Sequence, residues 1–503
     1  MDEPAGELLT AAPVPEPASP VPPAAAANTA GDADLARSIG WLLAAVGFMV
    51  GARPIADNSF LTHLATGHLI LARHGVPATD PYSATAAGQP WTVQSWLVSV
   101  VYAVLDAAVG PWAIRAFHGI LAAGIVLGLW RLVAPARQLV TRVALVTAAI
   151  VVGTSLWSPR PLLVGLAALV LTLQVVQGLR PRWWLVPLFW VWVNSHGSFA
   201  LGLALVGAVA VGAAIDQRRW WPRAEARACA AAAVGALVGM VNPLGWRLLW
   251  FPVELLGRGG SLRRVAEWRA PDFQSVPEQV YLGLLAVVVL AAARRASWRQ
   301  LVPALVFYAA GLMAVRNLGL ASLVVVAMLA PSLSGLRNGL ESRGSRSLTR
   351  VLAAMAVAAL AVSTVTVALS PALVLTSYPV ASVDWLAERG LVATDGVRLG
   401  HRETVGNYLT WRFGTDARVF MDDRFDFYPA DVIEDHNALV LGGDMAPVLE
   451  RHRFDVVLWA APSPLVRWLA RDPDWDIVRT DGDWIIACRR SSPAYARCSP
   501  AAP

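Results

Sequence analysis

Residues 160–178 read RPLLVGLAALVLTLQVVQG, and this stretch decides the fold class. After Arg160 it carries no charged residue through Gly178. A helix that is apolar on every face is buried either in a large protein core or in lipid. An α-helix needs about 20 mainly apolar residues to cross the hydrocarbon core of a bilayer. The stretch therefore predicts a membrane-spanning helix.

Similar segments lie on both sides of this stretch. Of the 503 residues, 56% are hydrophobic and 15% are charged, which is more apolar surface than one soluble core can bury. We expect an all-α polytopic membrane bundle of about 11 to 13 transmembrane helices, because backbone groups in lipid must pair within their own segment. The segments are 41–52, 91–110, 112–134, 139–157, 160–178, 183–194, 198–215, 228–250, 279–293, 300–315, 318–336 and 350–370.

The arginines lie mostly between these segments. The chain has a net charge of +6, but its two ends are acidic, so the positive charge indicates membrane topology and not a nucleic-acid partner. The positive-inside rule places the arginine-rich loops near 218–227, 294–299 and 337–350 in the cytoplasm. The chain after residue 370 should then lie outside.

The segment count conflicts with this topology. Twelve crossings from a cytoplasmic tail would end in the cytoplasm, so one segment is miscounted. We expect the error beside Asn194-Ser195-His196-Gly197 or at a re-entrant helix. With that correction, the loop that holds Arg131, Arg137 and Arg142 would break the charge rule.

Changes in composition divide the chain into four regions. An acidic, Ala- and Pro-rich start predicts a disordered cytoplasmic tail. After the transmembrane part, short β-like runs at 397–400, 417–421, 455–459 and 484–488 alternate with helix-like stretches, which predicts a small extracytoplasmic α/β domain. The regions are 1–36 (tail), 37–371 (transmembrane, with a first extracytoplasmic loop at 53–90), 372–491 (α/β domain) and 492–503 (flexible tail).

The three cysteines lack the spacing of metal ligands, and no metal site is assigned. Cys229 lies in an apolar run. Cys488 and Cys498 both fall at the end of the α/β domain, where a disulfide can form if the domain lies outside the cytoplasm.

The first loop contains Asp57 and Asp80 in a part of the chain with few acids. Asp57 precedes a stretch whose apolar residues would line one side of a short helix in the membrane interface. A carboxylate at the membrane rim can act as a general base toward a hydroxyl. Asp57 and the two residues after it are also good N-caps, so capping is an equal alternative. Asp80 precedes Pro81, which favours an ordinary turn.

The loop resembles that of the GT-C superfamily of membrane glycosyltransferases, in particular a bacterial set. The similar stretches span most of the chain: HGVPATDPYSATAAGQPWTVQSWL (74–97), WVNSHGSFALGL (192–203), VNPLGWRLL (241–249), AEWRAPD (266–272), VRNLGL (315–320), NYLTWRF (407–413) and VFMDDRFDFY (419–428). The resemblance implies a polyprenyl-phosphate sugar as donor and an Asp of the first outer loop as base. By motif position, that Asp is Asp57.

Such a donor needs a cationic clamp, because its phosphate gains charge as the sugar leaves. Arginine suits this task because its rigid fork can hold two phosphate oxygens. Arg316 is favoured because it begins an apolar segment on the predicted outer side, and Arg160 and Arg247 are further candidates. The alternative for each is an arginine that snorkels to the interface.

Other polar residues are candidates for the substrate cavity. Asn194 and His196 interrupt two apolar runs, which is tolerated where backbone lines a cavity, although a tight interhelical turn fits equally. Glu267, Trp268 and Asp80 complete this set of cavity candidates. In the C-terminal domain, Asp422, Asp423 and Arg424 could bind a divalent cation or sugar hydroxyls, while a solvated loop cross-bridged by Arg424 is favoured.

The sequence thus predicts an inverting glycosyltransferase in the plasma membrane of a bacterium, acting on an extracytoplasmic lipid, glycan or protein acceptor. A divalent cation is the one cofactor to consider. Two alternatives stay open: a non-catalytic scaffold or glycan-binding protein of the same fold, and, third, a lipid or glycan transporter, which would need paired polar breaks in its spans.

Overall fold

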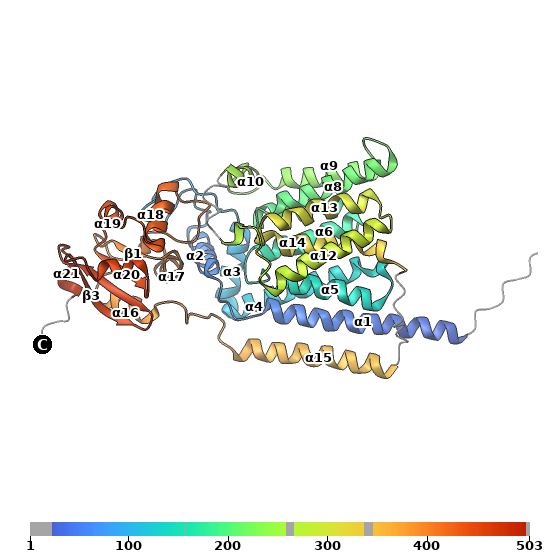
Figure 1. The fold of residues 1–503 in the computed structure, drawn as a ribbon, viewed down its shortest axis with the longest axis horizontal. Coiled ribbons are helices and arrows are strands. Elements are labelled where there is room, and N and C mark those ends of the chain that lie inside the picture. The colour runs from blue at the N-terminus through green and yellow to red at the C-terminus, as the bar shows by residue number, and fades with distance from the viewer. Residues whose placement is uncertain (1–22, 155, 258–265, 336–345, 499–503) are drawn as a thin grey trace, which may run out of the picture.

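The computed structural model describes residues 23–154, 156–257, 266–335 and 346–498 (Figure 1). Its described residues form a mostly helical bundle with a small sheet-containing domain at one end. We call this end of the bundle the domain end and the opposite end the tail end. Helix α1 (Pro23–Gly51) begins within the region predicted as a disordered tail, where an alanine-rich stretch has high helix propensity. Residues 1–22 lie outside the described residues.

The long helices of the bundle run side by side between the two ends (Figure 1). After α1 they are α4 (Pro111–Leu132), α5 (Leu139–Gly153), α6 (Leu162–Val176), α7 (Leu185–Ser195), α8 (Phe199–Gln217), α9 (Arg223–Val238), α12 (Val276–Ala293), α13 (Trp298–Met313), α14 (Leu318–Leu329) and α15 (Arg346–Leu369). Among the described residues, six apolar stretches are long enough to cross a membrane, by length and composition: 32–51, 111–136, 199–217, 276–293, 315–333 and 346–369.

Contacts at the two ends show that successive bundle helices alternate in direction. At the domain end, Arg115 at the start of α4 donates to the carbonyl oxygens of Ala52 (3.0 Å) and Ser370 (3.3 Å), which follow α1 and α15. At the tail end, Arg294 after α12 donates to the carbonyl oxygen of Ser334 at 2.8 Å, beyond α14. The list of bundle helices has an odd number of members, so the chain starts at one end and leaves at the other.

Helix α3 (Trp96–Val109) corrects the predicted span at 91–110. Its first residue, Trp96, donates to Asn194 at the domain end (2.9 Å), and Trp112, just beyond its last residue, donates to Ser370 at the same end (3.3 Å). The helix therefore lies across the domain end, as Figure 1 also shows. The miscounted segment is this one, and not the pair beside Asn194.

With α3 across the end, three arginine-rich connections lie at the tail end. The connection from α4 to α5, which carries Arg131, Arg137 and Arg142, lies at the tail end, where its short 3-10 helix η1 (Ala134–Ala136) contacts η5 (Ala330–Leu333). The expectation that this loop breaks the charge rule was wrong. The arginine-rich connections at 218–227 and 294–299 lie at the same end.

The C-terminal domain contains one four-stranded sheet with the order β1-β2-β4-β3. Strands β1 (Leu399–His401) and β2 (Val456–Ala460) are parallel, and β4 (Trp484–Arg489) pairs antiparallel with β2 and with β3 (Trp475–Asp481). The predicted run at 417–421 makes only an isolated bridge, between Val419 and Ser83 of the first loop. The helices of the domain are α16 (Val380–Glu388), α17 (Glu403–Phe413), α18 (Ala430–Leu441), α19 (Ala446–His452), α20 (Pro464–Leu469) and α21 (Tyr495–Cys498).

The possible disulfide between Cys488 and Cys498 is formed, and it ties α21 to β4. Cys498 belongs to the region predicted as a flexible tail, so the ordered structure extends seven residues past the predicted end of the domain at residue 491. Residues 499–503 lie outside the described residues.

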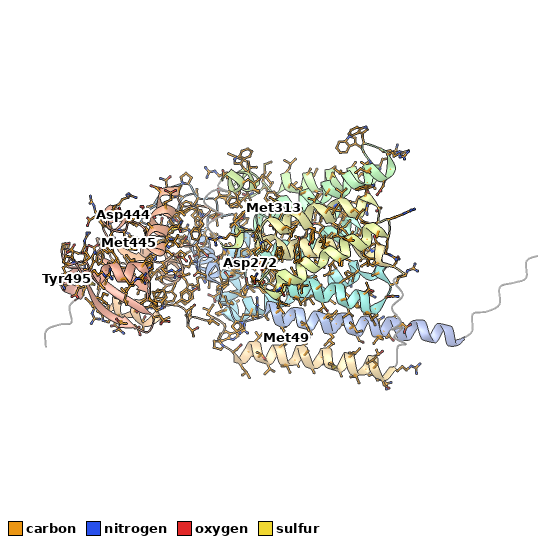
Figure 2. All side chains as sticks on the ribbon, viewed as in Figure 1. Met49, Asp272, Met313, Asp444, Met445 and Tyr495 are labelled. Carbon is orange, nitrogen blue, oxygen red and sulfur yellow. A yellow bond between two sulfur atoms is a disulfide. The ribbon has the colours of Figure 1, made fainter. Side chains whose placement is uncertain are left out.

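The first loop joins the bundle to this domain. Helix α2 (Asn58–Arg73) packs with its buried face between α3 and α17. A β-carbon on Gly67 would lie only 1.9 Å from the carbonyl oxygen of Ser99, so α2 and α3 touch through their backbones. Figure 2 shows Asp272 and Met313 at the domain end of the bundle, facing the domain that carries Asp444 and Met445.

Candidate functional site

Asp57 lies at the domain end, immediately before α2. Its Oδ1 accepts a hydrogen bond from the Ser59 backbone N–H at 3.1 Å, so the capping alternative holds. Its Oδ2 accepts from Ser158 Oγ at 3.2 Å and from Arg160 Nε. The side chain is only 7% exposed. A carboxylate offers about four lone-pair positions, so these three donors leave one for a further hydroxyl.

Arg160 connects Asp57 to a second acid. Its guanidinium pairs with Asp57 through Nε and with Glu267 through Nη1 at 2.5 Å. Burial alone would lower the pKa of Arg160, but the charges of Asp57 and Glu267 outweigh burial and raise that pKa above its usual value. Three predicted site residues, Asp57, Arg160 and Glu267, are therefore in contact. Because Arg160 already pairs with two carboxylates, it is less suited to bind a phosphate.

Arg316 has the opposite surroundings. It lies in the 3-10 helix η4 (Val315–Asn317), and its guanidinium stacks on Trp268 at 4.1 Å from the ring centroid. Trp268 ends η3 (Ala266–Trp268), next to Glu267. Within the part of the chain that the structure describes, Arg316 makes no hydrogen bond or ion pair, which leaves its donors available to an anion.

Two histidines belong to the same neighbourhood. Burial, followed by the charges of Arg316, His63 and Arg160, lowers the pKa of His196 to about 3. Burial and the charge of Arg160 lower the pKa of His63 to about 4. Both rings are therefore neutral at physiological pH. His196 accepts from the Ser198 backbone N–H at its Nδ1, and His63 Nδ1 lies 3.2 Å from Ser99 Oγ.

Asp423 reaches the same place from the C-terminal domain. Ser59 donates from its hydroxyl to Asp423 Oδ2 at 2.5 Å, while its backbone N–H donates to Asp57. The neighbouring Asn58 accepts from Tyr378 Oη at 3.0 Å. The first two residues of α2, Asn58 and Ser59, thus both bind groups of the C-terminal region.

The electrostatic setting of Asp423 differs from that of Asp57. Burial raises the pKa of the Asp423 carboxyl to about 7, and the negative charges of Asp422 and Asp57 act in the same direction. The Ser59 hydroxyl and the Asn407 amide oppose the shift. A carboxyl that titrates near neutral pH can exist in either protonation state under physiological conditions.

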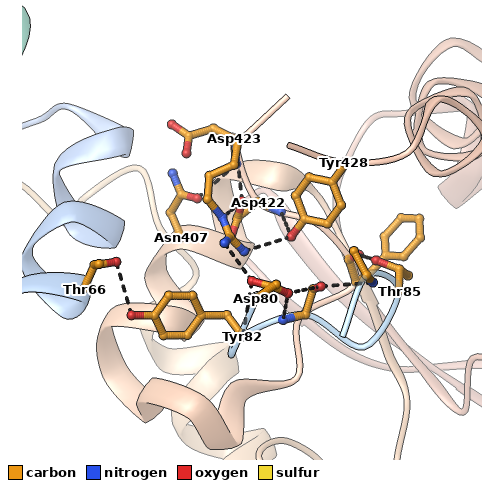
Figure 3. Close-up of polar contacts among 12 residues, drawn as sticks. Thr66, Asp80, Tyr82, Thr85, Asn407, Asp422, Asp423 and Tyr428 are labelled. Carbon is orange, nitrogen blue, oxygen red and sulfur yellow. Dashed lines mark hydrogen bonds and ion pairs between the residues drawn. The ribbon is translucent and has the colours of Figure 1, made fainter. Parts of the chain in front are cut away.

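Asp80, Asp422 and Arg424 form a separate, buried cluster (Figure 3). Arg424 donates to Asp80 from Nη1 at 2.7 Å and to both oxygens of Asp422 from Nε at 2.8 and 2.9 Å. The two carboxylates are fully buried, and the guanidinium stacks on Trp91 at 4.5 Å. The solvated loop predicted for this region is wrong, because the first loop covers it. The cluster attaches the first loop to the domain, in line with the structural role favoured for Asp80.

The remaining candidates lie apart from the Asp57 cluster. Asn194 uses its amide within the bundle: it accepts from Trp96 Nε1 and donates to the carbonyl oxygens of Trp190 and Gly239. Arg247 is exposed at the start of α10 (Arg247–Gly257). Among the residues that the structure describes, no group of three or more His, Cys, Asp or Glu side chains is arranged to hold a metal ion.

Sequence reasoning missed Ser59, Ser158 and Asn407 as neighbours of the acids. Ser59 was noted only as a capping residue. Ser158 is 101 residues from Asp57 and Asn407 is 16 residues from Asp423, and neither separation is a recognisable local spacing. The motif stretch NYLTWRF, which begins at Asn407, was the one available signal.

Neither the models of known protein families nor the functionally curated proteins gave a match to this chain. The functional proposal therefore rests on the sequence resemblance and on the geometry of the domain end.

Proposed function

We propose that the chain is a multi-pass protein of a bacterial plasma membrane, with the tail end in the cytoplasm and the domain end outside. The arginine-rich connections of the tail end support this orientation through the positive-inside rule. The disulfide between Cys488 and Cys498 supports an oxidising compartment for the C-terminal domain.

This orientation can be tested by cysteine labelling in a Cys229→Ala background. A membrane-impermeant maleimide should label Asp444→Cys in intact spheroplasts and Trp220→Cys only after lysis, because these exposed positions lie at opposite ends. Labelling of Trp220→Cys before lysis would reverse the topology.

At the domain end we propose an inverting glycosyltransferase reaction with a polyprenyl-phosphate sugar as donor. The observation that carries the proposal is that Asp57 and Arg316 both adjoin the pair of Arg160 and Glu267. Arg160 binds Asp57, and Arg316, whose donors have no partner among the described residues, stacks on Trp268 next to Glu267. The lipid-phosphate donor and the superfamily come from the sequence resemblance, and the geometry supplies one acid and one anion-binding group for them.

The roles follow from the charges that develop. The acceptor hydroxyl uses the open lone-pair position of Asp57, which takes its proton as the acceptor oxygen bonds to the anomeric carbon. The bond from that carbon to the phosphate oxygen breaks on the opposite face, which inverts the configuration, and the electron pair stays on the phosphate. Arg316 offsets the charge gained by the leaving group. Arg160 and Glu267 hold Asp57 in position.

The test is complementation of cells that lack the protein, followed by mass spectrometry of lipids and wall polysaccharides. Asp57→Asn should abolish the glycan that the wild-type chain restores, since loss of a general base typically costs about 10²- to 10⁴-fold in rate. Asp106→Asn is the matched control, because Asp106 is an acid of the same end that pairs with His68. Full restoration by Asp57→Asn would remove the base assignment.

One observation favours a second candidate, a non-catalytic glycan-binding protein. Asp57 already accepts from three donors, as a purely structural carboxylate would. This candidate predicts that Asp57→Asn and Arg316→Gln both restore the wild-type glycan profile, provided that the chains are present in equal amounts.

A further inference from the structure

Two carboxylates from distant parts of the chain meet at Ser59. The residue donates from its backbone N–H to Asp57 at 3.1 Å and from its hydroxyl to Asp423 at 2.5 Å. Because the nitrogen and the hydroxyl oxygen of one serine are about 3 Å apart, the two bonded carboxylate oxygens lie within about 9 Å of each other. One pyranose ring with its hydroxyl groups spans a similar distance.

Asn407 supplies an independent sign of a ligand beside Asp423. The side chain of Asn407 is fully buried, and its Oδ1 accepts from the Asp423 backbone N–H at 3.1 Å. Its Nδ2 lies near enough to the Asp423 carboxylate to lower that group's pKa, but it is not in hydrogen-bonding geometry with any described residue. A buried donor without a partner is uncommon and destabilises the folded state, so a bound ligand that accepts a hydrogen bond from this amide would be favourable. In Figure 3 the Asn407 amide nitrogen and the Asp423 carboxylate point to the same side, away from Asp80.

The chemistry of these groups selects the ligand. Asp423 accepts hydrogen bonds and the Asn407 amide donates them, and a hydroxyl group does both. Two nearby acids, Asp57 and Asp422, disfavour an anionic ligand.

We propose that Asp423 and Asn407 form the acceptor subsite next to Asp57, and that the acceptor is an uncharged, polyhydroxylated glycan. One sugar hydroxyl binds Asp423 and Asn407, and this places a second hydroxyl of the same sugar at Asp57. A protein side chain or a simple lipid alcohol has one hydroxyl and cannot use both positions. The proposal rests on the proposed function for its catalytic half and concerns binding alone.

The experiment measures binding without donor or turnover. The full-length protein in lipid nanodiscs is titrated with methyl α-D-glucopyranoside, methyl β-D-galactopyranoside, methyl α-D-mannopyranoside and N-acetylserine methylamide, followed by saturation-transfer NMR. We expect saturable binding of at least one glycoside, at least about tenfold tighter than that of the serine amide. Asp423→Asn and Asn407→Ala should each weaken it about tenfold or more.

Asp474→Asn is the matched control, because Asp474 lies in the same domain but pairs with Arg489 of β4. It should bind like the wild type. Hydrogen exchange of β2 and β4 reports whether each variant is folded. If Asp423→Asn destabilises the domain, Asn407→Ala still tests the subsite, because it retains Asp57 and Asp423.

Several results would overturn the subsite: no glycoside binds the wild type, the serine amide binds equally well, or folded Asp423→Asn and Asn407→Ala bind like the wild type. None of these depends on transfer. Conversely, if binding requires Asp423 while Asp57→Asn restores the cellular glycan, the subsite stands and the base assignment fails.

Discussion

Replacing Arg424 with methionine should release the first loop from the C-terminal domain. In the wild type, one guanidinium neutralises two fully buried carboxylates, Asp80 and Asp422. Its removal leaves both acids buried without a counter-charge. Loss of one partner from a buried ion pair typically costs about 3–5 kcal/mol. We expect a loss of this size in the local free energy of opening.

Hydrogen exchange followed by mass spectrometry measures this opening directly. A loss of about 3–5 kcal/mol corresponds to exchange that is roughly 10²- to 10³-fold faster or more in residues 80–91 and 419–428. The triple variant Asp80→Asn, Asp422→Asn, Arg424→Met has no charge left to compensate, so it should recover most of the protection. Arg451→Gln is the control, because the Arg451 side chain is 57% exposed, and its pair with Asp435 should contribute less than about 1 kcal/mol.

Two results would refute the reasoning. Exchange in residues 80–91 and 419–428 that stays within about threefold of the wild type in Arg424→Met would mean that the cluster is solvated. An equal effect of Arg451→Gln would mean that burial does not set the energy of the pair.

Two further predictions concern the packing of α2. Burial and acidic neighbours raise the pKa of Asp423 to about 7, so protonation of this carboxyl favours the folded state. The docking of α2 on α17 should therefore be strongest near pH 4 and weaken as the pH rises to about 7. In pH-corrected hydrogen exchange of residues 57–66, Asp423→Asn should remove this dependence. Gly67→Ala should lower the free energy of unfolding by about 1–3 kcal/mol, because the added β-carbon would overlap the Ser99 carbonyl oxygen. Gly75→Ala is the control and should be neutral, because no atom lies closer than 3.8 Å to its β-carbon. Equal melting temperatures of the two variants would contradict the close packing of α2 and α3.

Hydropathy predicted most of the bundle and misplaced one helix. The span at 91–110 has enough apolar residues, but Ser95, Ser99 and Tyr102 are buried against neighbours at the domain end, where Tyr102 Oη lies 2.8 Å from His118 Nε2. A sequence window sums hydrophobicity and contains no direction, so it cannot distinguish a helix that crosses lipid from one that lies across the bundle. The arginines held part of the missing information, because a chain without this crossing puts the connection with Arg131, Arg137 and Arg142 at the same end as those at 218–227 and 294–299. The connection from α9 to α12, which carries Arg247 and Arg269, lies at the other end.

The acids were found from sequence, but their partners were not. Asp57 was predicted either as a cap or as a base, and the structure keeps both alternatives, since capping uses Oδ1 while Arg160 binds Oδ2. Arg424 was expected to neutralise its own loop in water. It reaches Asp80, 344 residues away, and a pairing of that separation is set by the packing of whole domains and not by local pattern.

The contact of Ser59 with both Asp57 and Asp423 also depends on the order in which the chain is synthesised. These two acids are made near the beginning and near the end of translation, with 364 residues between Ser59 and Asp423. A chain shorter than 423 residues has the first acid but not the second. The contact of both acids with Ser59 can therefore form only after most of the polypeptide has been made.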